Sequence, residues 1–477
     1  MIKSIFFLID KDIYVHYNIC IERKIHQMNT TTINHFQKIR IGMVLSFLLL
    51  ICCFLYNPAN VFAQTGTCGY YGATGISGAI DYKIEDGRII FDGKGSPENP
   101  SYWDVDCKRI IKANNVISVV VGRPFFAPEN ADGMFADLFS VREMYLSNLN
   151  VSRTVSMANM FNMNYLEQDS ESALTRLIVG GWDTSGVENM GGMFTGCSSL
   201  TSLDLSYWDT SNVLSMGWMF SDCSSLINLN LGGWNTSKVI DMSGMFANCT
   251  SLTNLNLSGW TTNALINIEF MFGHCSGLAE LDLSGWDVSG VTNMDSVFDG
   301  CTNLEILNLS GWDTSNVIYM GNLFENCSSL INLNLDGWNT ANVEYMGKMF
   351  ENCHELESLD LNCWDTSSVT NMENMFFGCT SLKSLNISDW NTSNVENMKD
   401  MFVYCTALTK LDLSNWDTSK VRDMSGMFHF CSALESLDIS GWNTANVTDT
   451  KEMFSGCISL TGVDVSSWDT PNNLPAK

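Results

Sequence analysis

Residues 182–207 read WDTSGVENMGGMFTGCSSLTSLDLSY, and a closely similar stretch begins again at residue 208. A Trp returns every 26 residues up to residue 468 without one change of spacing, and Phe and Cys columns keep the same step within residues 194–457. The Trp column consists of Trp182, Trp208, Trp234, Trp260, Trp286, Trp312, Trp338, Trp364, Trp390, Trp416, Trp442 and Trp468. A spacing held this strictly predicts a solenoid, in which each repeat forms one coil stacked on the previous one.

The first half of the unit has a helical pattern. Val187, Met190, Phe194 and Cys197 follow the spacing of one helical face. This pattern predicts a short helix of about two to three turns, with its exposed amides capped by a side chain from residues 183–185.

The second half of the unit has the pattern of a strand. Leu200, Leu203 and Leu205 form the leucine-rich-repeat signature LxxLxL, in which the last two Leu point inward and Asp204 points outward. The Trp that follows is expected to be a buried aromatic rung. The sequence therefore predicts an α/β solenoid, a leucine-rich-repeat rod with a parallel β-sheet on one face and short helices on the other.

The solenoid is predicted to span residues 132–471 as about 13 coils, followed by a tail at 472–477. Its opening coils are degenerate, because Leu149 stands where a Trp is expected and a seven-residue insertion lies near residues 167–173. Such divergence is typical of the capping end of a repeat array.

Residues 64–131 are predicted to form a small β-rich N-terminal capping module. Asp86-Gly87 suits a type I′ hairpin turn, and a Val-rich strand is expected at 116–121. Cys68 and Cys107 both fall in this module and are candidates for a disulfide.

The unit WDTSxVxxMxxMFxxCxxLxxLxLSG resembles the 26-residue repeat of BspA-type leucine-rich-repeat surface proteins of bacteria, over residues 132–470. Residues 68–103 are similar to the module that often precedes such repeats. The resemblance implies a location at the cell surface and, for some members, binding to host matrix proteins or to other cells. It implies no catalytic residues.

The N-terminus is consistent with export. Residues 41–56 form an apolar run that follows Lys38 and Arg40 and precedes a small-residue cleavage site ending at Ala63. We therefore expect a signal peptide cleaved near Ala63, with translation starting at Met28, and a secreted or cell-surface protein. Lipid attachment at Cys52 is the alternative.

The charge of the chain excludes several partners. Its net charge is −27, with 52 acidic and 25 basic side chains. Such a surface repels nucleic acid, heparin and anionic lipid. The apolar run at 41–56 is short for a membrane span of about 20 residues, so no span is expected in the mature chain.

A polar column is predicted on the outer face of the sheet and is the candidate ligand-binding face. It consists of Asp204, Asn230, Asn256, Asp282, Asn308, Asn334, Asp360, Asn386, Asp412, Asp438 and Asp464. Three interpretations stay open: a ladder of amides and hydroxyls that solvates the sheet, a face that binds a ligand, or carboxylates bridged by calcium. A cation is expected first between Asp412, Asp438 and Asp464, because no Asn separates them.

The other chemistry-bearing columns suit packing. The Cys column is expected to be buried free thiols, with cross-coil disulfides as the alternative, and Cys363 an exposed thiol. The Met columns are expected in the core because Val and Leu replace Met there, although thioethers can bind soft metals. Asp183 and its equivalents are expected at a turn.

Catalytic motifs are missing from residues 64–477. Their only His residues, His274, His354 and His429, fall in separate coils, and there is no phosphate-binding glycine loop, GxSxG motif or His-containing metal spacing. The sequence thus predicts a binding protein and no enzyme, with no cofactor other than possible calcium. The predicted role is that of an adhesin for extracellular protein or glycan ligands, and the alternative is a structural stalk without a specific ligand.

Overall fold

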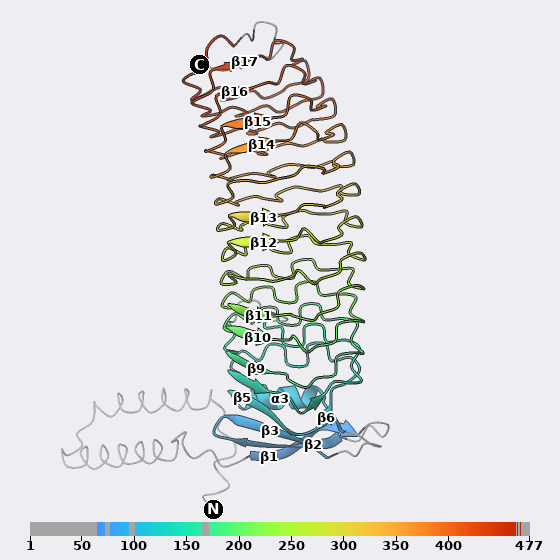
Figure 1. Ribbon diagram of the computed structural model, residues 1–477. Helices are drawn as coiled ribbons and strands as arrows, with labels where there is room; N and C mark the ends of the chain where they lie inside the picture. The colour runs from blue at the N-terminus through green and yellow to red at the C-terminus, as the bar shows by residue number, and fades with distance from the viewer. Residues whose placement is uncertain are drawn as a thin grey trace, which may run out of the picture. The chain divides into compact units, whose positions relative to one another are not determined.

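The computed structural model describes residues 64–71, 77–94, 101–164, 171–463, 465 and 468, which belong to one compact unit, Ala63–Lys477 (Figure 1). The expected signal peptide with its cleavage site at Ala63, Cys52, Asp464 and the tail at 472–477 lie outside the described residues. Within the described part of the chain, no helix has the length and apolar character needed to cross a bilayer.

The N-terminal module is built on an antiparallel hairpin. Strand β1 (Gln64–Tyr71) pairs with β2 (Ser77–Glu85), which pairs with β3 (Arg88–Gly93). The predicted turn is confirmed: Ile84 faces Ile89, and Asp86 and Gly87 have φ values of 51° and 73°. Strand β5 (Ser118–Arg123) begins two residues later than the Val-rich strand expected at 116–121 and lies parallel to β3.

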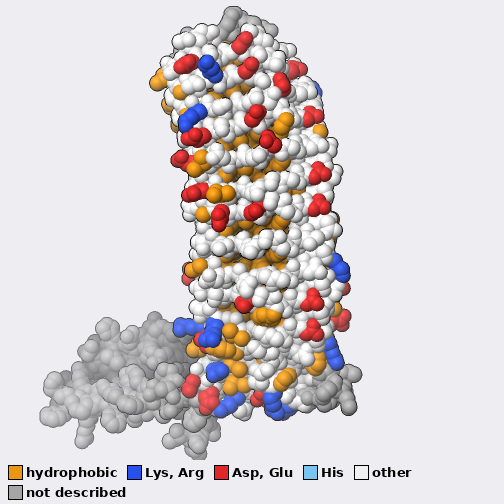
Figure 2. Space-filling model, viewed as in Figure 1, with side chains coloured by type: hydrophobic (Ala, Val, Ile, Leu, Met, Phe, Trp, Pro, Cys, Tyr) orange, Lys and Arg blue, Asp and Glu red, His pale blue; other side chains and the backbone are white. Residues whose placement is uncertain are grey.

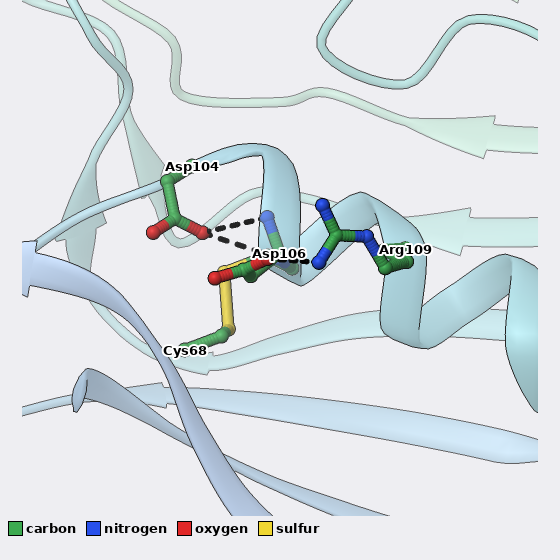
Figure 3. The surroundings of a disulfide bond; sticks show 5 residues. Cys68, Asp104, Asp106 and Arg109 are labelled. Carbon is green, nitrogen blue, oxygen red and sulfur yellow. Dashed lines mark hydrogen bonds and ion pairs between the residues drawn. A yellow bond between two sulfur atoms is a disulfide. The ribbon is translucent and has the colours of Figure 1, made fainter. Parts of the chain in front are cut away.

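The module also contains helix α3 (Val105–Ala113), which the sequence interpretation missed. Asp104 caps it, because its Oδ1 accepts hydrogen bonds from the amides of Asp106 (3.0 Å) and Cys107 (3.2 Å). The candidate disulfide is confirmed, since Cys107 on α3 is bonded to Cys68 on β1 (Figure 3). The bond ties the helix to the hairpin.

The module and the first coils share one sheet, so the cap continues into the solenoid. Its strand order is β8-β6-β4-β1-β2-β3-β5-β7-β9. The remaining members are β4 Ser101–Tyr102, β6 Phe125–Phe126, β7 Glu143–Tyr145, β8 Leu149–Asn150 and β9 Arg176–Ile178. Glu143 pairs with Arg176, a step of 33 residues, whereas Ser202 pairs with Asn228, a step of 26. The opening coil is therefore longer than the others, as expected.

Most later coils contribute one short strand, and these strands pair in parallel as four two-stranded sheets, whereas the coils with Leu255 and Leu333 have no strand (Figure 1). The pairing is in register, so Leu203 lies beside Leu229 and Leu281 beside Leu307. The strands are β10 Ser202–Asp204, β11 Asn228–Asn230, β12 Glu280–Asp282, β13 Ile306–Asn308, β14 Ser358–Asp360, β15 Ser384–Asn386, β16 Lys410–Leu411 and β17 Ser436–Leu437. The predicted parallel leucine-rich sheet is confirmed.

The predicted helices on the other face are wrong. In the described residues after α3, the segments that contain the Met and Phe columns form consecutive turns. The amide of Met193 donates within its coil to the carbonyl of Met190 (3.3 Å), whereas the amide of Phe194 donates to the carbonyl of Met219 in the next coil (2.8 Å). Backbone hydrogen bonds thus alternate between one coil and its neighbour.

Two left-handed positions in each coil explain why no helix forms. Gly192 and Gly196 have φ values of 63° and 73°, and the equivalent residues of later coils also have positive φ. A residue in this conformation cannot continue a right-handed helix. Apolar residues three and four positions apart still point into the core of the solenoid, because each tight turn returns the chain to the core. The caps expected from residues 183–185 therefore have no helix to cap.

The core consists of stacked columns. The Trp rungs are only 1–8% exposed, which confirms that they point inward. Trp182 and Trp208 stack at 5.8 Å between ring centroids, and Phe194 and Phe220 at 5.4 Å. Because every rung packs on the next coil, the stability of one coil depends on its neighbours.

A buried Thr column runs beside the Trp rungs and was not singled out from the sequence. The hydroxyl of Thr210 donates to the carbonyl of Asn235 (3.0 Å), and the Asn235 amide is 2.9 Å from the same hydroxyl. Thr184 makes the equivalent bond to Asp209 (3.0 Å). These side chains satisfy backbone groups between coils that would otherwise be buried without a partner.

Candidate ligand-binding face

The polar column lies at the ends of the short strands, and nearly all of its described members are exposed. In most of these residues, Oδ1 accepts a hydrogen bond from the backbone amide two residues further along the chain. The donors are Ser206 to Asp204 at 3.1 Å, Ser284 to Asp282 at 3.0 Å and Ser440 to Asp438 at 3.1 Å. Each such side chain closes a turn that leads the chain from the strand toward the next Trp. The sequence interpretation had not identified this structural role.

Strand register places the column residues of adjacent coils side by side. Asp204 pairs with Asn230, Asp282 with Asn308 and Asp360 with Asn386. The side-chain Nδ2 of Asn386 donates a hydrogen bond to Oδ1 of Asp360 at 3.0 Å. Between these two coils, an Asn next to an Asp converts repulsion between carboxylates into a hydrogen bond.

Hydrogen bonds favour the charged form of several carboxylates of the column. Hydrogen bonds from the Ser206 hydroxyl and amide lower the pKa of Asp204, and those from Ser440 lower the pKa of Asp438. At neutral pH the face is therefore anionic at these positions. Figure 2 shows that carboxylates outnumber cationic side chains on the visible side of the coils.

A cation site is not assembled among the described residues, since no three or more His, Cys, Asp or Glu side chains are grouped so that they could hold a metal ion. Asp412 and Asp438 do influence each other, because the charge of Asp438 opposes the lowering of the pKa of Asp412. Both carboxylates already accept hydrogen bonds from the Ser two residues on.

Exposed apolar side chains interrupt the polar sheet face. Ile306 is 62% exposed, and Ile227, Ile331 and Tyr207 are between 44 and 47% exposed. They were not predicted from the sequence, although Ile306 stands where other coils have Ser, Asn or Glu, and this was a usable signal. They give the face contact area that polar side chains alone do not provide.

The second acidic column occupies a turn, as predicted. The amide of Ser185 donates to Oδ1 of Asp183 (3.2 Å), and the amide of Ser211 donates to Oδ1 of Asp209 (2.9 Å). Asp287, by the same geometry, accepts from the Ser289 amide (3.0 Å). Its members stand one residue beyond each Trp, away from the strands.

The Cys column is a ladder of free thiols, which confirms the first of the two interpretations. The thiol of Cys223 donates to the carbonyl of Phe194 at 3.2 Å, and the same bond recurs along the column. Burial raises the pKa of Cys197 to about 12, so the thiol stays protonated. Cys363 is exposed, as expected, and the Met columns are buried in the core.

The three His residues of the described chain do not form one site. They belong to different coils, and among them only His274 comes within 4 Å of a carboxylate, with 3.8 Å between its Nε2 and Oδ2 of Asp299. Nothing in the geometry of the described residues assembles a nucleophile, a base and an oxyanion site.

The fold and these faces define a class: a leucine-rich-repeat-like solenoid of parallel coils with a 26-residue repeat, which presents repeated polar side chains to solvent. The chain belongs to the family described as "Mycoplasma protein of unknown function, DUF285", which matches residues 163–281, 266–385 and 374–475. A search of the curated proteins gave no match.

Several solved structures are similar to the chain, among them two bacterial proteins. A leucine-rich repeat protein from Eubacterium ventriosum has 13% sequence identity and a TM-score of 0.39, covering 85% of this chain and 97% of that one. A leucine-rich cell surface protein from Faecalibacterium prausnitzii has 15% identity and a TM-score of 0.36, covering 83% and 96%. Because both TM-scores lie below 0.5, neither similarity bears on the ligand or the role of this chain.

Proposed function

We propose that this chain is a secreted or cell-surface adhesin of the BspA type, with a cap at 64–131 and a solenoid at 132–471. Its ligands are extracellular proteins or glycans of a host or of other cells. Binding takes place on the sheet face, through the polar column from Asp204 to Asp464, and requires no catalysis. The surface location rests on the apolar run and cleavage site that end at Ala63.

The observation that carries the proposal is the exposure of side chains that a turn holds in place. Oδ1 of Asp282 accepts a hydrogen bond from the Ser284 amide, and the residue remains exposed to solvent. The flanking Leu281 and Leu283 are buried, so the carboxylate stands on a rigid support. Repetition of such a group in successive coils permits many weak contacts in register, and avidity follows from their number.

The exposed Ile side chains favour a protein among these ligands. Ile306 and Ile331 lie in neighbouring coils of the same face, beside Asn308 and Asn334. An apolar contact surrounded by polar groups is typical of protein interfaces.

A structural stalk is the second candidate, and one observation favours it. The column residues close the turns after the strands, so the fold itself explains an Asp or Asn at this position without any ligand. In that case the net charge of −27 would serve to keep a long rod soluble.

Binding of residues 64–477 to immobilised matrix proteins, mucin and whole cells distinguishes the two. The test variant replaces Asp282, Asn308 and Asn334 by Lys. The matched control replaces Asp287, Asn339 and Asn391 by Lys, which changes the net charge by the same amount, because these exposed residues also accept an amide hydrogen bond but stand off the sheet.

An adhesin should show saturable binding that the sheet-face variant loses and the control keeps. Equal loss in both variants would mean that net charge alone drives the interaction. Absence of binding to every surface by the folded chain would favour the stalk.

A further inference from the structure

A second surface of the solenoid, separate from the sheet face, has the form of a ligand site. A groove of about 680 Å³ opens over the turn segments of four successive coils, within residues 158–164, 189–195, 215–222 and 241–248. Its volume lies within the range of about 300–1,000 Å³ typical of sites for small ligands. We call it the turn groove.

Glycines create the turn groove. Gly191, Gly192 and Gly217 line it, and the residues at the same positions three coils further on are Glu269, Phe270 and Asp295. A Cβ on Gly217 would lie only 2.7 Å from Oδ2 of Asp241, so the polar side chains of the groove lie directly over the glycine backbone. The repeat thus leaves an opening here that larger side chains occupy elsewhere.

One aromatic ring forms a platform at the turn groove. Trp218 is 45% exposed, whereas every rung of the Trp column is 8% exposed or less. Its φ of 59° is strained for a bulky residue, and the equivalent positions of other coils often have Gly, Asn or Asp. The indole lies against Gly244, where a Cβ would collide with it, and its centroid is 6.1 Å from that of Phe270. The ring is therefore held in place while it remains accessible.

The turn groove also offers polar groups that the fold leaves free. The Nδ2 atoms of Asn159 and Asn189 have no hydrogen-bond partner among the described residues, although their Oδ1 atoms accept bonds from Asn162 (2.7 Å) and Gly191 (2.9 Å). The hydroxyl of Ser243, a residue only 9% exposed, has no partner in the described chain either.

The charge of the turn groove excludes anionic ligands. Asp222 and Asp241 are its charged lining residues, and the described lining contains no Lys or Arg. Phosphate, sulfate and uronate groups would be repelled here and would find no cationic partner.

We propose that the turn groove binds a neutral oligosaccharide. Sugar hydroxyls both donate and accept, so one ring can satisfy an Asn amide donor and an Asp carboxylate acceptor together. The apolar C–H face of a sugar ring can stack on the electron-rich face of an indole, which here is supplied by Trp218. The turn groove combines free side-chain amides, carboxylates without cations and one fixed indole. This combination suits a neutral sugar better than a peptide, because a peptide requires a larger apolar surface.

The full chain is titrated with chitotetraose, mannotriose, maltotetraose and lacto-N-tetraose. Calorimetry and tryptophan fluorescence monitor the binding. A heparin-derived tetrasaccharide serves as the anionic probe. We expect saturable binding of at least one neutral oligosaccharide, with a shift of tryptophan emission because Trp218 is the most exposed indole of the described chain. The anionic probe should not bind.

Three variants and a control locate the binding. Trp218→Ala should weaken it at least about tenfold, and Trp218→Phe should retain most of it because Phe270 shows that the position accepts a phenyl ring. Gly191→Glu should also weaken it, since Glu269 and Glu373 stand at the same position in other coils and the variant should fold. Tyr404→Ala removes an exposed aromatic residue with a φ of 59° from a distant coil and should change nothing.

Three results would overturn the proposal: a folded chain that binds none of the four neutral oligosaccharides, binding that survives both Trp218→Ala and Gly191→Glu, or a protein ligand lost in these variants while no oligosaccharide binds. The last result would make the turn groove a protein site. The outcome is independent of the proposed adhesin face, because the Lys variant at Asp282, Asn308 and Asn334 should bind the oligosaccharide normally.

Discussion

Two adjacent tryptophan rungs differ in one hydrogen bond, and this difference allows a quantitative test of the core. Trp364 and Trp390 are 3% and 1% exposed, and each stacks between two other Trp rings at 6.2–6.4 Å. The Nε1 of Trp390 donates to the carbonyl of Leu361 at 2.9 Å, whereas the Nε1 of Trp364 is buried without a partner. Replacement of each Trp by Phe removes the same atoms, but only at position 390 does it break a bond.

The expected cost follows from these contacts. Both variants lose packing, and this contribution should be similar because both sites are equally enclosed. Trp390→Phe also loses a hydrogen bond worth about 1 kcal/mol; the Leu361 carbonyl keeps the Trp364 amide as a partner at 3.1 Å, which limits the loss. Trp364→Phe instead removes an unsatisfied buried donor, which costs about 1–3 kcal/mol in the parent protein. Trp390→Phe should therefore be the more destabilising by roughly 2 kcal/mol.

Guanidinium unfolding followed by circular dichroism gives both free energies, and an unchanged m-value shows that the same cooperative unit unfolds. The double variant Trp364→Phe/Trp390→Phe measures how strongly the two rungs depend on each other. Equal destabilisation by the two single variants, or a larger effect at position 364, would refute the assignment of the hydrogen bond.

Three further predictions concern the thiols, the acidic column and metal ions. Iodoacetamide at pH 8 should label Cys363 and leave the buried thiols from Cys197 to Cys431 unlabelled until denaturant is added. The reason is burial, which raises the pKa of Cys275 and Cys379 to about 12. Peptide mapping by mass spectrometry measures the labelling. Asp438→Asn should be somewhat less stable than the parent at pH 7 and should lessen the acid sensitivity of the fold, because an amide accepts the same bond, as Asn308 does from the Ser310 amide (3.2 Å), but carries no charge that acid can remove. The sign follows from the lowered pKa of Asp438: its contribution is present above the unfolded pKa of about 3.9 and is lost as the pH falls through the lower folded value. The unfolding midpoints of parent and variant, measured between about pH 2 and 6, should therefore differ at the upper end of this range and converge at the acid end. Chelator should leave the melting temperature unchanged, since Asp412 and Asp438 already accept hydrogen bonds from Ser414 and Ser440; a decrease seen in the parent but not in Asp438→Ala would reveal a bridging cation.

Prediction from sequence succeeded where one residue type must face one environment in every coil. The inward Trp rungs, the Leu-rich parallel strands, the buried Met and Cys columns and the exposed thiol at Cys363 all follow from periodicity and polarity. The hairpin at Asp86-Gly87 follows from local turn chemistry. These features depend on residues close in sequence or on a strict repeat, and both can be read without coordinates.

The candidate sites were less accessible to sequence. The sequence correctly predicted that the column from Asp204 onward points outward. It did not predict that the Oδ1 atoms accept hydrogen bonds from the backbone amides two residues further along the chain. The turn groove could not be found at all, because it depends on Gly191, Gly217 and Trp218 meeting across different coils. The available signal was the departure of these three residues from the composition of their columns.

The sequence by itself determined the length of the coil, the inward and outward columns, and the parallel in-register stack, since a 26-residue repeat can bury its apolar side chains only against identical neighbours. Only the tertiary structure decided what joins the strands. A helix and a series of turns place apolar residues at the same spacing of three and four, so the side chains cannot distinguish them. The turns form because half of their amides donate to the next coil, as Phe194 does to Met219, and these partners exist only once the coils have stacked.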